Sequence, residues 1–306
     1  MIIALSGGIG GAKLALGLSR VLSPEELLII ANTGDDFEHY GLTICPDTDT
    51  LLYTLAGLDN PQLGWGRADE SWAFMQTLAG LGGADWFRLG DRDLALHVLR
   101  SHRLRAGEAL SAITDDLRQR FGIGPRILPM SDDPVRTRIG TDQGWLDFQD
   151  WFVRLRAEPL ARAVQFASVE KARAQPALLD ALQAKPRGIV LCPSNPFISI
   201  EPILALPGLR DAIKASGAPV VAVSPIIAGQ AVKGPTARMF EALGITPSAA
   251  AVAARYGDLL HGYVMEEGDD ADGIVPRVFH AETLMRNLDD KMNLARQVLA
   301  AIDAIR

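Results

Sequence analysis

The opening stretch MIIALSGGIGGAKLALGL constrains the fold more than any other part of the chain. Ile2–Leu5 is an unbroken apolar run, which is typical of a strand buried on both faces of a parallel sheet. Four glycines follow it: Gly7, Gly8, Gly10 and Gly11. The apolar spacing from Ala12 to Leu18 then predicts a helix. A strand, a glycine turn and a helix in this order direct backbone N–H groups at an anion, so we expect a phosphate-binding loop. The alternative is a tight turn that needs glycine for its geometry alone.

Two named phosphate motifs do not match this loop completely. A Walker A loop needs Ser or Thr directly after its lysine, whereas Lys13 is followed by Leu14. The dinucleotide fingerprint G-x-G-x-x-G is met only in its first half, because position 13 is not glycine. Acidic residues do follow the second apolar run, Leu27–Ala31, at Asp35 and Asp36. NAD binding therefore remains open, but it is not the favoured interpretation.

Apolar runs that resemble strands alternate with helical patterns along the chain. The runs are Ile2–Leu5, Leu27–Ala31, Arg126–Pro129, Gly188–Cys192, Val220–Val223 and Gly262–Met265. The helical patterns include Asp91–Arg100, Glu108–Arg118, Pro176–Gln183 and Leu284–Ile305. This alternation predicts a Rossmann-like α/β fold, a mostly parallel sheet with helices on both faces. Residues 135–156 instead alternate like an antiparallel hairpin. We expect one catalytic unit, 1–306, with an inserted hairpin and helical subdomain at about 130–175.

Composition narrows the class of protein. The 306 residues are 48% hydrophobic and 22% charged, with a net charge of −7, which is typical of a soluble globular protein and gives no basic footprint for nucleic acid. The only cysteines, Cys45 and Cys192, exclude a disulfide scaffold and favour a reducing compartment. No apolar run is long enough to span a membrane. The chain begins directly with a core strand, so we expect a cytoplasmic protein without a leader, a membrane or a nucleic-acid partner.

In open α/β sheets ligands bind beyond the carboxyl ends of the strands, and the residues there are polar in this chain. After the second strand, Asp47-Thr48-Asp49 offers two carboxylates to a hard cation such as magnesium. The alternative is that one of them caps the helix that starts near Thr50. The five histidines, His39, His97, His102, His261 and His280, show no metal-ligand spacing, and we expect them to be structural or solvated.

Four further segments follow predicted strands or bends. In RLGDRD, Arg88 can contact a phosphate or carboxylate, and Asp91 has the position of a helix N-cap. In LPMSDDP, two carboxylates precede a proline and either face a ligand or begin the hairpin. The segments CPSNPFISIEP and SPIIAGQAVKGPTARM add small polar groups and one cation at anion-binding turns: Ser194, Asn195, Lys233 and Gly234. Several such turns beside carboxylates predict a ligand with more than one phosphate and a cation.

These motifs together resemble the 2-phospho-L-lactate transferase family of coenzyme F-420 biosynthesis. The resemblance rests on SGGIGGAKL, NTGDDFEHYGLTICPDTDTLLYTLAG, RLGDRD, LPMSDDPVRT, FQDWFV, PSNPFISI and SPIIAGQAVKGPTARM, in order along nearly the whole chain. It implies a transfer in which the deazaflavin alcohol Fo attacks a guanosine-diphosphate-linked three-carbon acid and releases GMP. The acid, whether phospholactate, phosphoenolpyruvate or 3-phosphoglycerate, cannot be read from the sequence.

The resemblance also implies roles for individual residues. Asp49 and Arg88 fall where Fo-binding residues are expected, although many relatives have lysine in place of Arg88. Asp47 and Asp49 are the predicted catalytic carboxylates, with Asp49 as the expected ligand of Mg²⁺. The glycines Gly7, Gly8, Gly10 and Gly11, together with Lys13, Ser194, Asn195, Lys233 and Gly234, are the expected nucleotide and phosphate contacts. A homodimer is implied as well. The alternative function is a nucleotide-sugar-binding regulatory protein of the same fold.

Overall fold

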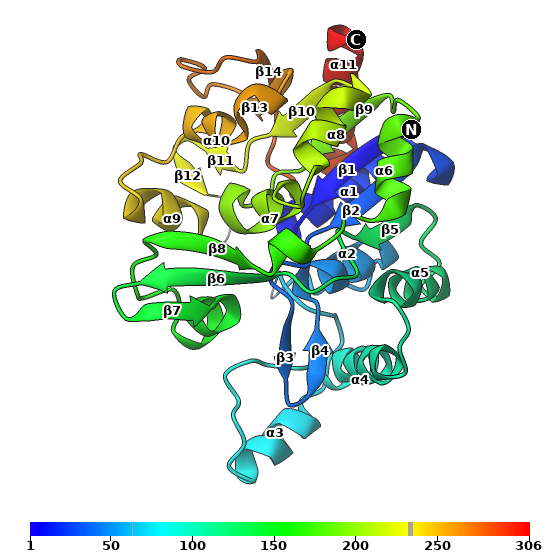
Figure 1. Ribbon diagram of the computed structural model, residues 1–306, viewed down its shortest axis with the longest axis vertical. Coiled ribbons are helices and arrows are strands. Elements are labelled where there is room, and N and C mark those ends of the chain that lie inside the picture. The colour runs from blue at the N-terminus through cyan, green and yellow to red at the C-terminus, as the bar shows by residue number, and fades with distance from the viewer. Residues whose placement is uncertain (63, 232–234) are drawn as a thin grey trace.

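The computed structural model describes residues 1–62, 64–231 and 235–306 around a seven-stranded sheet (Figure 1). Its spatial order is β14 (Arg277–Ala281), β13 (Gly262–Glu266), β10 (Val220–Val223), β9 (Gly188–Leu191), β1 (Ile2–Ser6), β2 (Leu27–Ala31) and β5 (Arg126–Pro129). Every neighbouring pair is parallel. The predicted α/β fold with a parallel sheet is therefore confirmed.

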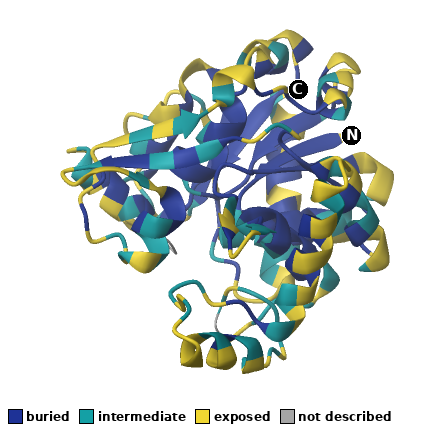
Figure 2. Ribbon diagram, turned by 60° about the horizontal axis from the view of Figure 1, so that its bottom comes forward, coloured by how far each residue is buried: buried dark blue, intermediate teal, exposed yellow. Residues whose placement is uncertain are grey.

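Helices cover both faces of this sheet, and this explains why its strands are continuous apolar runs. Ile2 and Ala4 of β1 point into one core, whereas Ile3 and Leu5 point into the other. The first core is closed by α1 (Gly8–Val21), α2 (Pro46–Ala56), α5 (Leu110–Arg120) and α11 (Leu288–Ile305). The second is closed mainly by α6 (Pro176–Gln183), α7 (Glu201–Leu204), α8 (Leu209–Ser216), α9 (Thr236–Ala242) and α10 (Ala249–Tyr256). Figure 2 shows the central strands as buried.

The order of the strands creates a crevice at one place. β1 lies between β2 and β9, so the chain builds the sheet outward in one direction through β2 and β5 and in the other through β9, β10 and β13. The carboxyl ends of β1 and β9 therefore form the topological switch point at which such sheets bind ligands. The two ends are tied together there, because Ser194 Oγ donates to the Gly7 carbonyl at 2.8 Å and accepts from the Gly7 N–H at 3.2 Å.

Smaller elements extend from this edge of the sheet. The hairpin β3 (Phe37–His39) and β4 (Leu42–Ile44) lies beside α3 (Ala73–Gly80) and α4 (Asp91–Arg105) at the bottom of Figure 1. β7 (Gly144–Asp147), β6 (Arg136–Thr141) and β8 (Ala163–Ala167) form a separate antiparallel sheet. β11 (Ile226–Ile227) pairs with β12 (Gln230–Ala231). Among the described residues, no helix is long and apolar enough to cross a membrane.

The structure corrects some of the sequence expectations. The first helix begins at Gly8 rather than Ala12, so three of the glycines form its first turn. The last helix begins at Leu288, where Asn287 caps it, rather than at Leu284. The predicted hairpin has a third strand, β8, and the sheet has an edge strand, β14, that the sequence reading missed. Both are partly exposed and lack the apolar run that marks a fully buried strand.

Packing between α1 and α11 depends on Gly17. A Cβ atom at this position would collide with the carbonyl oxygen of Lys291, which is backbone and cannot rotate away. Intrinsic propensity alone would make Gly17→Ala stabilising by about 1 kcal/mol in a helix interior. We expect the opposite sign, a loss of roughly 1–3 kcal/mol from overpacking, in urea unfolding. Gly80→Ala is the matched control, because nothing lies within 4 Å of a Cβ there. Equal stability of the two variants would contradict the packing argument.

Candidate functional site

A cavity of about 370 Å³ lies at the carboxyl ends of β1 and β9. Its walls come from the start of α1, the first two turns of α2, the loop after β9 and the segment that leads into α4. Two single π-helical turns, Asp150–Arg154 and Pro196–Ile200, also contribute wall residues. Nine of the residues predicted for the site line this cavity: Gly7, Gly8, Gly10, Lys13, Asp47, Asp49, Arg88, Ser194 and Asn195. Sequence segments more than 180 residues apart thus meet at the switch point, as their hydrogen bonds also show.

Three other residues predicted for the site are not among these nine: Gly11, Lys233 and Gly234. Gly11 is buried and is not part of the cavity wall; a Cβ there would collide with the hydroxyls of Ser6 and Ser194. Lys233 and Gly234 lie outside the described residues. A close contact also explains why position 10 is a glycine, because a Cβ atom there would collide with the Pro193 carbonyl. The glycines therefore let the first turn of α1 pack directly onto the loop after β9. The phosphate-binding role predicted for this loop stays a prediction.

Asp47 occupies the N-terminal end of α1. Its carboxylate accepts from the Gly8 N–H and, at 2.9 Å, from Asn32 Nδ2. Burial raises the pKa of Asp47 to about 6, although these two hydrogen bonds act in the other direction. The helix α2 that carries Asp47 has Cys45 at its N-cap position and no side-chain cap. The alternative in which Asp47 or Asp49 caps the helix that carries it is therefore excluded, and Asp47 instead binds the first N–H of α1.

A second carboxylate lies close to Asp47. Asp35 Oδ1 is 3.4 Å from Asn32 Nδ2, the same nitrogen that binds Asp47, and Asp35 also lines the cavity. Burial raises the pKa of Asp35 well above its ordinary range, and the neighbouring charges of Asp47 and Asp36 raise it further. Asn32 is fully buried and also donates to the Ile198 carbonyl at 3.1 Å. It therefore holds two carboxylates beside one wall of the cavity with a neutral donor.

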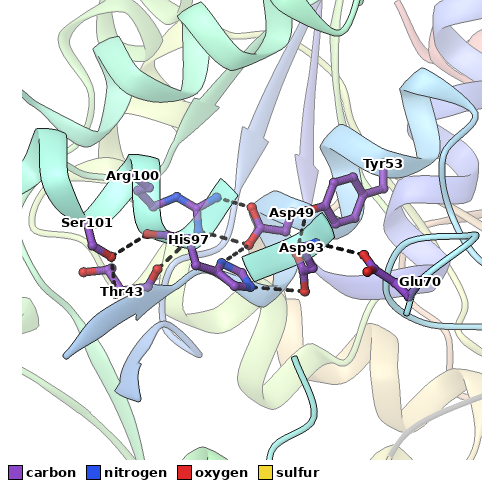
Figure 3. Close-up of polar contacts among 8 residues, drawn as sticks. All are labelled: Thr43, Asp49, Tyr53, Glu70, Asp93, His97, Arg100 and Ser101. Atoms are coloured by element: carbon purple, nitrogen blue, oxygen red, sulfur yellow. Dashed lines mark hydrogen bonds and ion pairs between the residues drawn. The ribbon is translucent and has the colours of Figure 1, made fainter. Parts of the chain in front are cut away.

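Asp49 has a different environment from Asp47, although only one residue separates them. Both of its oxygens accept from the guanidinium of Arg100, Oδ2 from Nη1 at 3.0 Å and Oδ1 from Nη2 (Figure 3). Asp49 is 5% exposed and Arg100 is 1% exposed. The charge of Asp49 raises the pKa of Arg100 despite the opposing effect of burial. Asp49 is thus a buried carboxylate whose charge is balanced by a bidentate partner.

His97 connects the Asp49–Arg100 pair to a further carboxylate, that of Asp93. His97 Nε2 lies 3.1 Å from Asp93 Oδ2, and its Nδ1 lies 3.7 Å from Asp49 Oδ2. Tyr53 donates to the other oxygen of Asp93 at 2.5 Å. Burial raises the pKa of Asp93, but His97 and Tyr53 outweigh it and the pKa falls below its ordinary value. In Figure 3, dashed lines connect Arg100 to Asp49, Asp49 to His97, His97 to Asp93 and Asp93 to Tyr53.

Arg88 lines the cavity from the segment just before α4. Its guanidinium carbon lies 4.2 Å from the centre of the Trp72 ring, and its side chain is exposed. Gly90, not Asp91, is the N-cap of α4. Asp91 instead accepts from the N–H groups of Ala73 and Phe74 at 3.0 Å, and so caps α3. The prediction that Asp91 caps its own helix is therefore wrong, because the neighbouring helix start lies within reach of its carboxylate.

The helix start of α4 is capped by Glu70. Its oxygens accept from the N–H groups of Arg92 at 2.7 Å and Asp93 at 2.8 Å. The two acidic caps therefore link α3 and α4 reciprocally, and Arg88 lies in the segment between them. The LPMSDDP carboxylates do not line the main cavity: Asp132 binds Ser111 and Asp133 binds Arg173. The carboxylates of this motif therefore do not contribute to the main cavity.

The carboxylates differ in how well they suit magnesium. Ligand atoms of Asp49, Asp93 and His97 lie within 4.8 Å of one another. A cation bound to Asp49 would compete with Arg100 for both oxygens, however, and magnesium prefers oxygen ligands to imidazole. Asp35 and Asp47 contact neutral amides, and bringing two buried carboxylates together favours a cation or a proton between them. This pair fits magnesium better, and the assignment of the metal to Asp49 stays a prediction.

Four residues of this site were not predicted as functional: Asp93, His97, Arg100 and Tyr53. His97 was expected to be structural or solvated. The available signal was helical spacing, because Asp93, His97 and Arg100 follow one another at i, i+4 and i+7 and so share a helix face. This face of α4 is directed at Asp49 on α2. No pattern within α4 predicts a contact between the two helices.

The buried carboxyl of Asp36 makes stability depend on pH. Burial raises its pKa to about 7 from an ordinary value of 3.8, so the folded state holds the proton more tightly than the unfolded chain. The free energy of unfolding should therefore fall as pH rises from about 4 to about 7 and level off above that. Between pH 5 and pH 8, wild type should lose on the order of 2 kcal/mol relative to Asp36→Asn, because about two pH units of this interval lie below the raised pKa. Urea titrations at both pH values measure this, and parallel curves for the two proteins would refute it.

Comparisons with known proteins find matches over almost the whole chain. A family model described as 2-phospho-L-lactate transferase CofD matches residues 2–299. The phosphoenolpyruvate transferase of Kitasatospora aureofaciens is 43% identical over 319 residues, covering 100% of this chain and 98% of that protein. The phosphoenolpyruvate transferase of Streptomyces coelicolor is 41% identical over 318 residues, covering 100% and 99%.

Among solved structures, a member of the UPF0052 family from Bacillus halodurans superposes with a TM-score of 0.65. It is 14% identical and the alignment covers 97% of this chain and 98% of that protein. At this level of identity the similarity concerns the fold alone.

Proposed function

This chain belongs to the 2-phospho-L-lactate transferase family, and we propose that it transfers a phosphoenolpyruvyl group from a guanosine-diphosphate-linked donor to Fo. The family and the names of its relatives support the coarser statement, a phosphoenolpyruvyl or phospholactyl transfer in coenzyme F-420 biosynthesis. The observation that carries the finer proposal is the identity of about 41–43% with relatives named phosphoenolpyruvate transferases, over the whole chain.

The reaction needs two ligands side by side. A hydroxyl oxygen of Fo forms a bond to the phosphorus that carries the three-carbon acid, the bond from this phosphorus to GMP breaks, and the hydroxyl loses its proton. Catalysis of this kind depends mainly on positioning and on the stabilisation of charge. The residues that would do this line one cavity: the first turn of α1, Ser194, Arg88 and Asp49.

The donor is proposed to lie over the α1 turn. Helix N-termini and exposed N–H groups bind anions, and Lys13, which lines the cavity, adds a cation there. Asp47 occupies the Gly8 N–H in this structure, so a phosphate at this position would have to replace or share that contact. Magnesium, when bound by Asp35 and Asp47, would neutralise these carboxylates and the developing phosphate charge.

We retain a homodimer as part of the proposal, which light scattering of the purified protein would test.

The function is tested by incubating the protein with Fo and magnesium and with each of three donors. In each donor GMP is joined through its phosphate to the phosphate of phosphoenolpyruvate, phospholactate or 3-phosphoglycerate. We expect GMP release and a product mass for the enolpyruvyl adduct, and loss of both on chelation of the metal. Preference for another acid would correct the donor. Binding of a nucleotide sugar without GMP release from any donor would instead favour the alternative, a regulatory protein of the same fold.

Arg88 is expected to act on acceptor binding rather than on folding. Its exposed guanidinium already stacks on Trp72, and a planar cation can likewise stack on a deazaflavin ring. Arg88→Ala should raise KM for Fo by roughly fivefold or more, about the value of a cation–π contact, and move stability by less than about 0.5 kcal/mol. Arg92→Ala, in the same motif but not on the cavity wall, is the control. A KM for Fo equal in the two variants would remove Arg88 from the acceptor site.

A further inference from the structure

Arg100 of α4 and Asp49 of α2 form a buried ion pair next to the cavity, and a contribution to stability does not by itself explain why the pair is there. Arg100 is 1% exposed and its guanidinium engages both oxygens of Asp49. Replacing a buried ion pair by well-packed apolar side chains is often neutral or stabilising, because both charges must leave water. A pair of this kind beside a cavity is therefore better explained by what it does to the wall of that cavity.

Asp49 is the member of the pair that the cavity reaches. It lines the cavity, whereas Arg100 lies behind it and is not part of the wall. A carboxylate has about four lone-pair sites, of which the bidentate contact with Arg100 uses two. The others remain available to hydroxyl donors of a ligand. Arg100 thus leaves Asp49 able to accept hydrogen bonds while fixing the plane of its carboxylate.

Arg100 and its neighbour also attach this helix to the hairpin. Arg100 Nη1 lies 3.4 Å from the Thr43 carbonyl, and Ser101 Oγ accepts from the Thr43 N–H at 2.7 Å. On the opposite side, His97 contacts Asp49 and is itself held by Asp93. Asp49 is therefore enclosed by α4 from two sides, and its carboxylate has little freedom to change rotamer.

We propose that Arg100 is a positioning residue for the acceptor, acting through Asp49. It holds the Asp49 carboxylate in one orientation, so that this carboxylate accepts hydrogen bonds from the ribityl hydroxyls of Fo. The inference rests on the proposed function for the identity of the acceptor. It assigns Arg100 no contact with the donor, which is proposed to bind at the α1 turn.

The test compares Arg100→Lys with wild type, and Arg103→Lys serves as the matched control. Lysine keeps the charge but loses the planar fork that engages both oxygens. Arg103 lies in the same helix and also makes a multidentate ion pair, with Glu108 and Asp116, but neither of these partners lines the cavity, whereas Asp49 does. Binding of Fo alone is measured by its fluorescence, the KM for the donor by GMP release, and folding by thermal unfolding.

We expect Arg100→Lys to remain folded and to weaken Fo binding by about 10-fold or more, the scale of a lost charge-assisted hydrogen bond. The KM for the donor should stay within about twofold, as should both parameters of Arg103→Lys. A second comparison uses Asp49→Asn alone and together with Arg100→Met. The double variant should bind Fo no worse than Asp49→Asn, because Arg100 acts only through the carboxylate.

Three results would overturn the proposal. One is Fo binding by folded Arg100→Lys within about twofold of wild type, the size of a neutral surface change. Another is an equal loss for acceptor and donor. The third is failure of both Arg100 variants to fold, which would make Arg100 a purely structural residue. Failure of the proposed function is seen separately, because it appears in wild type, either as no binding of Fo or as binding without GMP release.

Discussion

The close contact between the first turn of α1 and the loop after β9 is the constraint on which the site depends. Gly10 packs against the Pro193 carbonyl, and Gly7 exchanges two hydrogen bonds with Ser194. These contacts bring the ends of two neighbouring strands to one point, although the residues involved are far apart in sequence. A side chain at Gly10 would push the two segments apart and would widen the crevice that the cavity occupies. The glycines thus serve the packing of the sheet edge first, and any anion site is built on this arrangement.

The carboxylates that line the cavity differ in their partners. Asp35 and Asp47 share the amide of Asn32, and burial raises the pKa of both. Asp49, two residues from Asp47, is instead paired with Arg100. Buried carboxylates without a cationic partner favour a proton or a metal, whereas a paired carboxylate favours neutral hydrogen-bond donors. Neighbouring carboxylates of one cavity are therefore suited to different groups, Asp35 and Asp47 to a cation and Asp49 to hydroxyl groups.

Local patterns predicted the sheet because its strands are buried on both faces and therefore read as apolar runs. The exposed edge strand β14 gave no such run and was missed. The residues at the strand ends were predicted because parallel strands direct their carboxyl ends to one edge, and nine of them line the cavity. The Asp93–His97–Arg100 face was not predicted as functional, since its partner, Asp49, lies on another helix and the pairing depends on tertiary packing. Asp91 was assigned to the wrong helix for the same reason.

The reciprocal caps of α3 and α4 have a mechanical consequence. Glu70 and Asp91 each bind the start of the other's helix, and Ser71 both donates to Asp91 and accepts its N–H at 3.0 Å. The chain from 70 to 93 is thereby closed into a hydrogen-bonded ring. A ring of this kind resists internal stretching but can be displaced as a whole. While both caps hold, Asp93 and the segment that carries Arg88 are therefore expected to move together, and loss of either cap would free the start of one helix from the other.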